Sequence, residues 1–183
     1  FQDGKNMDNN KVGDLLVLIL KVYKFVTYRD LPFILQRAEF FVPWANLFVQ
    51  IIQAPLPQSI MNVQDTDLRK PNSWVKCKKW SYANLFKLFS RYASTTLSGR
   101  YNYTDFKALY MNDFLPQFLT LLFQQIEQWG NGSIWLSDEC LYYMLYFLEQ
   151  AITQKASWKL IGPHYSTILE HVIFPLLRPT EET

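Results

Sequence analysis

The chain has 183 residues, enough for one domain with a sizeable core, and 49% of them are apolar. Its six glycines are few for the tight turns of an all-β fold, and its net charge of +2 is too small to indicate a nucleic acid or an anionic membrane by itself. No apolar run reaches the roughly 18 residues that a membrane span needs, so we expect no membrane insertion.

The spacing of apolar residues predicts six long helices joined by loops. In chain order they are expected over Lys11–Tyr28, Val42–Ala54, Asn72–Tyr92, Asn112–Trp129, Ser137–Gln154 and Pro163–Leu176. Pro43 suits the first position of the second helix, where a missing N–H costs nothing, and Asn72 or Ser73 suits the cap of the third. Shorter helical turns are expected at 33–36 and, with Thr104 as the cap, through about Met111.

No segment shows a convincing strand pattern, so the predicted fold class is all-α. The first and fifth predicted helices are apolar on almost every side, which indicates that neighbours cover each of them on several sides. Consecutive helices of this kind fit a two-layer α-solenoid or a compact bundle. The pattern does not decide between the two, because the helix starts do not recur at a strict period.

The third predicted helix, Asn72–Tyr92, has two unlike faces. Its apolar face carries Trp74, Cys77, Ser81, Leu85, Leu88 and Tyr92. Lys76, Lys79, Lys87 and Arg91 fall on the opposite face, and Trp80 projects from it. Core packing does not require an indole among cations, so these five residues form a candidate partner-binding face for an acidic protein surface. The alternative is a solvated basic face on which Trp80 packs against a neighbouring helix.

Other functional classes find little support in the sequence. A direct nucleic-acid contact is not expected, because the basic face is one helix long and lacks a recognised motif. His164 and His171 lack companion acids or cysteines, so we expect no metal site. Cys77 and Cys140 are expected to be buried thiols, and Asp138–Glu139 to cap the fifth helix. We predict no catalytic residues, no cofactor and no enzymatic activity.

Two blocks of sequence resemble the importin-β (karyopherin) superfamily, and in particular its importin-7 and importin-8 subgroup. The first is Trp74-Val75-Lys76-Cys77-Lys78-Lys79-Trp80 followed by Leu88-Phe89-Ser90-Arg91-Tyr92. The second is Trp158-Lys159, Pro163-His164 and Val172-Ile173-Phe174-Pro175-Leu176, with an acidic segment after it. Ala93 departs from the family pattern, which has a glycine there that would end the helix in a left-handed conformation.

The resemblance implies an α-solenoid of HEAT repeats, a right-handed superhelical array of helix pairs. Residues 1–183 would be a single segment of about three pairs, an internal fragment from the N-terminal half of a longer chain. The second, fourth and sixth helices would be outer A helices, and the first, third and fifth would be inner B helices.

The resemblance also implies a function. Such a nuclear transport receptor shuttles between cytoplasm and nucleus, carries protein cargo, releases it on binding Ran-GTP, and contacts Phe-Gly repeats of nucleoporins between its A helices. The residues alone leave open a helical scaffold of a larger assembly without Ran dependence. They also leave open a helical-bundle enzyme, which a carboxylate–histidine cluster in a closed pocket would favour.

Overall fold

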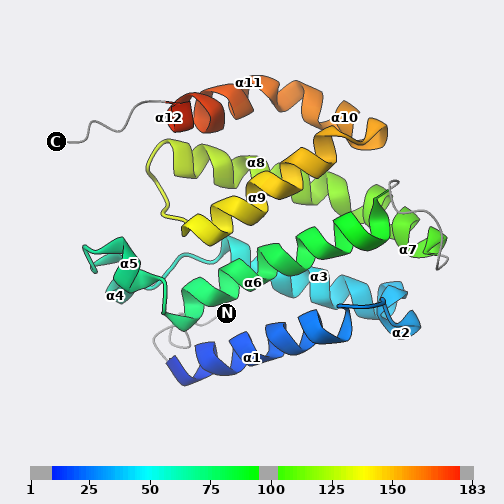
Figure 1. Cartoon of the computed structure of the whole chain (residues 1–183), viewed down its shortest axis with the longest axis horizontal. Helices are drawn as coiled ribbons and strands as arrows, with labels where there is room; N and C mark the ends of the chain where they lie inside the picture. The colour runs from blue at the N-terminus through cyan, green and yellow to red at the C-terminus, as the bar shows by residue number, and fades with distance from the viewer. Residues whose placement is uncertain (1–9, 95–102, 178–183) are drawn as a thin grey trace.

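The computed structural model describes residues 10–94 and 103–177, and within them the chain forms helices and turns without a strand (Figure 1). The predicted all-α class is confirmed, and the helices build a HEAT-type solenoid. The α-helices are α1 (Asn10–Val26), α2 (Phe33–Gln36), α3 (Ala38–Gln53), α4 (Gln58–Met61), α5 (Thr66–Arg69), α6 (Ser73–Leu88), α7 (Thr104–Ala108), α8 (Leu115–Gly130), α9 (Asp138–Ile152), α10 (Lys155–Ile161), α11 (Tyr165–Ile168) and α12 (Phe174–Leu177). Three π-helical segments, η2 (Phe89–Ala93), η3 (Leu109–Phe114) and η5 (Leu169–Ile173), and a 3₁₀ turn, η4 (Gly162–His164), continue or join them.

Helix α6 lies at the centre of the array. In Figure 1 it runs between α1 and α9, and these three helices form one layer. Helix α3 packs against α6 in a second layer, in which α8 contacts α10, α11 and η5. The first, third and fifth predicted helices therefore share one layer, and the second, fourth and sixth share the other.

The predicted apolar face of α6 is buried, and aromatic rings dominate the core beside it. The Asn72 side chain caps the helix by accepting a hydrogen bond from the Trp74 N–H at 2.9 Å, as expected for Asn at this position. Directly after α6, the fully buried Phe89 ring of η2 stacks on Phe147 with a centroid distance of 4.7 Å and on Tyr110 at 5.8 Å. These contacts join η2, η3 and α9 through one aromatic cluster.

Several helix boundaries differ from those predicted. Helix α3 begins at Ala38, so Pro43 lies inside it and the prediction of a first-position proline is wrong. The bond that Pro43 cannot donate would reach the carbonyl of the exposed Glu39, where water can replace it. Helix α7 begins at Thr104 and its cap position is Tyr103, so the prediction that Thr104 caps this helix is wrong. The sixth helix starts earlier than Pro163, because α10 at Lys155–Ile161 precedes it.

Helix α6 ends without a glycine. Its last turn widens into η2, where the Ser94 N–H donates to the Phe89 carbonyl at 2.7 Å, five residues back. Ser94 then leaves in an extended conformation, with φ −67° and ψ 144°. Ala93 therefore needs no left-handed backbone, and the π-turn takes the place of the glycine cap.

Candidate functional site

The structure places the five predicted binding residues on one side of the molecule. Lys76, Lys79, Trp80 and Lys87 lie on α6, and Arg91 lies on η2; all five are partly exposed. Their common side follows from helical spacing, as the sequence predicted. The neighbouring helix α1 supplies further cations to this side, so the surface is wider than one helix.

The Trp80 ring is surrounded by lysines from two helices. The Nζ of Lys24, on α1, lies 4.6 Å from the ring centroid, and that of Lys79 lies 5.0 Å away. Lys21, also on α1, approaches to 6.0 Å. Cation–π contacts at exposed sites contribute about 0.5–1 kcal/mol each. Trp80 therefore does pack against a neighbouring helix, and it does so through charged side chains.

A second ring, that of Tyr28, organises the other end of the surface. The Nζ of Lys87 lies 5.2 Å from its centroid and the Arg91 guanidinium 5.5 Å, and Arg91 also donates a hydrogen bond to the Tyr28 carbonyl. Partial burial lowers the pKa of Lys87, and the positive charges of Lys24 and Arg91 lower it further. Lys24 thus neighbours both ends and makes the surface continuous. We call this surface the basic face; it comprises Lys21, Lys24, Lys76, Lys79, Lys87 and Arg91 with the rings of Trp80 and Tyr28.

The α1 half of the basic face was not predicted from the sequence. Lys21, Lys24 and Tyr28 recur at i, i+3 and i+7, which puts them on one side of a helix. That spacing could have identified a second basic stripe. It could not have shown that α1 packs beside α6, because this pairing is a tertiary contact.

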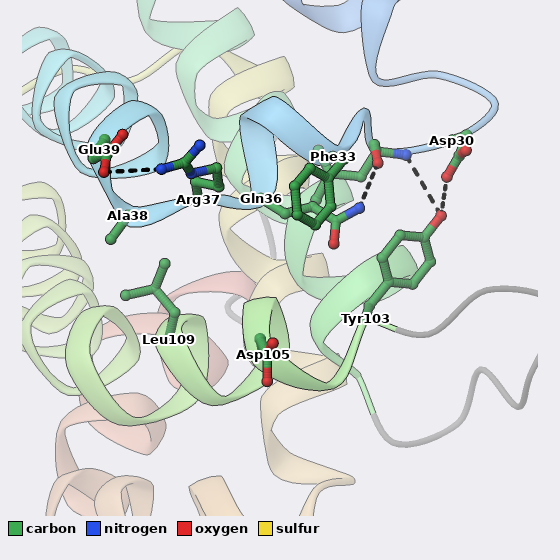
Figure 2. A pocket seen from close by; sticks show the side chains of 10 residues that line it. Asp30, Phe33, Gln36, Arg37, Ala38, Glu39, Tyr103, Asp105 and Leu109 are labelled. Carbon is green, nitrogen blue, oxygen red and sulfur yellow. Dashed lines mark hydrogen bonds and ion pairs between the residues drawn. The ribbon is translucent and has the colours of Figure 1, made fainter.

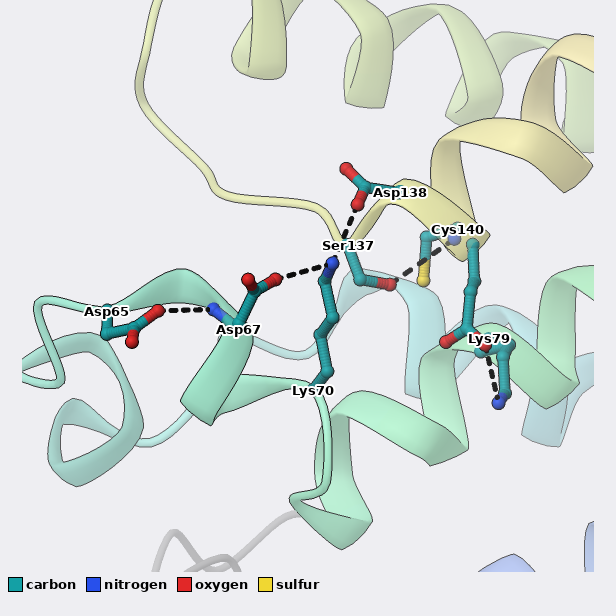
Figure 3. Close-up of polar contacts among 8 residues, drawn as sticks. Asp65, Asp67, Lys70, Lys79, Ser137, Asp138 and Cys140 are labelled. Atoms are coloured by element: carbon teal, nitrogen blue, oxygen red, sulfur yellow. Dashed lines mark hydrogen bonds and ion pairs between the residues drawn. The ribbon is translucent and has the colours of Figure 1, made fainter.

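Acidic residues at the start of α9 border the basic face (Figure 3). Lys79 forms an ion pair with Glu139 at 3.1 Å, and Lys70 bonds Asp138 at 2.8 Å. The cap of α9 is Ser137, whose hydroxyl accepts from the Cys140 N–H at 3.3 Å, so the prediction that the two acids cap this helix is wrong. They lie in its first turn instead, where a negative charge also suits the helix dipole.

Lys78, from the same basic run, has a different role. Its side chain is buried, and its Nζ donates to the carbonyls of Ile52 at 2.8 Å and Ala54 at 2.5 Å, at the C-terminal end of α3. Burial lowers the pKa of this ammonium from 10.5 to about 8. A cation that bonds the last carbonyls of a helix satisfies acceptors that the helix itself leaves unpaired. One feature of the sequence could have identified this role: Lys78 follows Trp74 by four residues, which puts it on the buried side of the helix.

One cavity is separate from the basic face. It measures about 710 Å³ and lies between α2, the start of α3 and α7 (Figure 2). The Tyr103 hydroxyl donates to Asp30 there, and Gln36 donates to the Leu31 carbonyl at 2.7 Å. Neither histidine lines this cavity, so it lacks the carboxylate–histidine cluster that would favour an enzyme.

The two histidines pack against helix α8. The ring of His164 stacks on Phe123 with a centroid distance of 4.3 Å, and His171 packs on Gly130. In the described ranges, no three or more His, Cys, Asp or Glu side chains cluster as metal ligands would. Both cysteines are buried free thiols, as predicted. None of the described helices combines the length and the apolar character needed to cross a membrane.

Sequence comparison identifies relatives for almost the whole chain. A Saccharomyces cerevisiae protein named "Nonsense-mediated mRNA decay protein 5" is 60% identical over all 183 residues, which make up 18% of that protein. An Arabidopsis thaliana "Importin beta-like SAD2 homolog" is 28% identical over 91% of the chain and 16% of its own length. Human importin-8 is 25% identical over 87% of the chain and 15% of its own length.

The chain thus spans less than a fifth of the length of these curated relatives. No family model and no solved structure matches it. The relatives named as importins carry the names of transport receptors rather than of enzymes.

Proposed function

We propose that this chain, whose resemblance to the importin-β superfamily its relatives confirm, is part of a nuclear transport receptor of the importin-7 and importin-8 kind. The observation that carries the proposal is that proteins named as importins align with 87–91% of the chain. Such a receptor shuttles between cytoplasm and nucleus, carries protein cargo and releases it on binding Ran-GTP. It has no catalytic role.

The exposed apolar residues at both ends of the array support a segment within a longer solenoid. Helix α1 exposes Val22 and Phe25, and α12 exposes Leu176 and Leu177. Side chains of this kind are covered by the next helix pair in a stacked array. We therefore infer that residues 1–183 form one segment of about three helix pairs from a longer chain.

The basic face is the proposed contact for Ran-GTP or for acidic cargo. Its cations are partly exposed, and Arg is a favoured anchor of protein interfaces. A long array can add many individually weak contacts to one usable affinity, which suits a carrier that must also release its cargo. No cofactor enters this proposal.

A hollow between neighbouring helices of the second layer is the proposed contact for nucleoporin Phe-Gly repeats. It measures about 460 Å³, lies between the C-terminal ends of α3 and α8, and is lined by Leu56, Ile134 and Trp135 among others. A hollow of this size that is lined in part by apolar side chains accepts an aromatic ring. Truncation of Ile134 to Ala should weaken binding of a Phe-Gly peptide, and unchanged affinity would remove this hollow from the proposal.

A Ran titration tests the proposed function directly. The full-length protein that contains this chain is immobilised, and Ran loaded with GTP is compared with Ran loaded with GDP. The titration is repeated after Lys76, Lys79, Lys87 and Arg91 are changed to Glu. GTP-selective binding that this variant weakens supports both the receptor and the contact.

Two other outcomes separate the alternatives. GTP-selective binding that the variant does not change supports the receptor and leaves the basic face to cargo or solvent. Binding that does not depend on the nucleotide overturns the transport proposal and favours the helical scaffold of a larger assembly.

A further inference from the structure

We propose that the basic face binds an extended acidic polypeptide segment, and that Trp80 and Tyr28 act as spacers that hold its cations together. The inference rests on the proposed function, because it takes the basic face as a binding surface. The competing ligand for a basic face with aromatic residues is a single-stranded nucleic acid.

The rings of the basic face are already engaged by cations. Lys24 and Lys79 lie within 5.0 Å of the Trp80 centroid, and Lys87 and Arg91 lie within 5.5 Å of the Tyr28 centroid. Proteins that bind single-stranded nucleic acid stack bases on free ring faces. A base that stacks here would compete with these cations for the rings, so the basic face offers its ammonium and guanidinium groups first.

Most of these cations lack an anionic partner. Within residues 10–94 and 103–177, the ion pair of this face is that of Lys79 with Glu139. Lys21, Lys24 and Lys87 have no ion pair with a described carboxylate, and Lys87 lies close enough to Lys24 and Arg91 to feel their charges. Carboxylates of a partner would relieve this repulsion, which is electrostatic complementarity of the kind that selects partners.

The dimensions of the basic face set the length of the ligand. Lys76 and Arg91 are fifteen residues apart on a continuous helix, which corresponds to about 22 Å along its axis. An extended chain advances about 3.3 Å per residue, so a peptide of about seven residues spans the face. Alternate side chains of such a peptide point to the same side, and three or four carboxylates could meet the cations at once.

The test compares two polyanions of equal charge on the full-length protein. The probes are a fluorescent peptide of seven glutamates and a fluorescent oligouridylate with seven phosphates, measured by anisotropy at about 0.15 M salt. The peptide is expected to bind at least about tenfold more tightly than the RNA. Changing Lys24 and Lys87 together to Glu is expected to weaken peptide binding by at least about tenfold, because both centres of the face lose a cation.

A matched control removes the effect of net charge. Lys155 and Lys159 on α10 are exposed, and their double change to Glu alters the net charge by the same amount. This control is expected to change peptide affinity by less than about twofold. A second pair, Lys24→Gln with Lys87→Gln, keeps side-chain size, and circular dichroism verifies that every variant is folded.

Two outcomes overturn the inference. RNA that binds as tightly as the peptide would mean that the rings do accept bases. A control that weakens peptide binding as strongly as the basic-face variants do would mean that binding is non-specific.

Failure of the proposed function is a separate result, because this assay contains no Ran. Peptide binding without GTP-selective Ran binding would leave the acidic partner in place and remove only the transport role.

Discussion

The buried lysine at the end of α3 makes a quantitative prediction for stability against pH. Lys78 has a pKa of about 8 in the folded chain and 10.5 when exposed, because burial disfavours its charged form. Between these two values the unfolded chain holds a proton that the folded chain has released, so stability rises with pH across this window. Below pH 8 the lysine is charged in both states, and the full cost of burying its charge lowers the stability of the folded chain. The difference between the two pKa values corresponds to about 3 kcal/mol in total.

The perturbation is Lys78→Met, which keeps the length of the stem and removes the titration. The unfolding free energy of each protein is measured in urea at pH 7 and at pH 9.5. Relative to the variant, the wild-type chain should gain about 2 kcal/mol over this range. Using the difference between two proteins cancels the titration of groups that they share.

Lys159→Met is the control, because this side chain is exposed in the folded chain as it is in the unfolded one. Its stability should follow that of the wild type at both pH values. If the Lys78→Met and wild-type values change in parallel to within about 0.5 kcal/mol, then the carbonyl hydrogen bonds fully offset desolvation and the reasoning is refuted.

Three further predictions follow from the core and the caps. Burial raises the pKa of Cys77 to about 12 and of Cys140 to about 11. A thiol reagent at pH 8 should therefore label neither cysteine in the native chain and both in guanidinium, and rapid labelling of the native chain would contradict this. Phe89→Ala should cost about 3–5 kcal/mol in urea unfolding, whereas Phe25→Ala, at a ring 73% exposed, should cost under about 0.5; equal losses would contradict the core assignment. Asn72→Ala should cost about 1 kcal/mol and Asn72→Asp much less, which thermal unfolding can check.

The all-α class was predictable because the helices have long apolar stripes with helical period. The cap at Asn72 was predictable for a local reason, since its side chain bonds an N–H two residues away. The start of α3 was not, because Pro43 is tolerated inside the helix where its missing bond faces solvent. Helix α10 was not predicted because its buried residues, Ser157 and Ile161, make a short apolar pattern that is interrupted by a polar side chain.

The candidate site was half predictable, and the division follows the range of the interactions. Lys76, Lys79 and Lys87 share one helix, so their spacing in sequence already placed them together. Lys21 and Lys24 meet Trp80 only because α1 packs beside α6, a contact that spans more than fifty residues of sequence. Helical periodicity does not encode which helices become neighbours.

The adjacent residues Lys78 and Lys79 show why a basic run should not be treated as one unit. They lie about 100° apart around α6, so one points into the core and the other into the basic face. The sequence alone distinguishes them by register, since Lys78 aligns with Trp74 and Tyr82. Reversing the charge of Lys78 would leave α3 carbonyls without a donor and place a buried carboxylate beside them. Such a variant would unfold the chain and would not test binding at the basic face. Binding experiments must therefore change Lys79 and its surface neighbours while Lys78 stays intact, and a variant that mixes the two would report stability as if it were affinity.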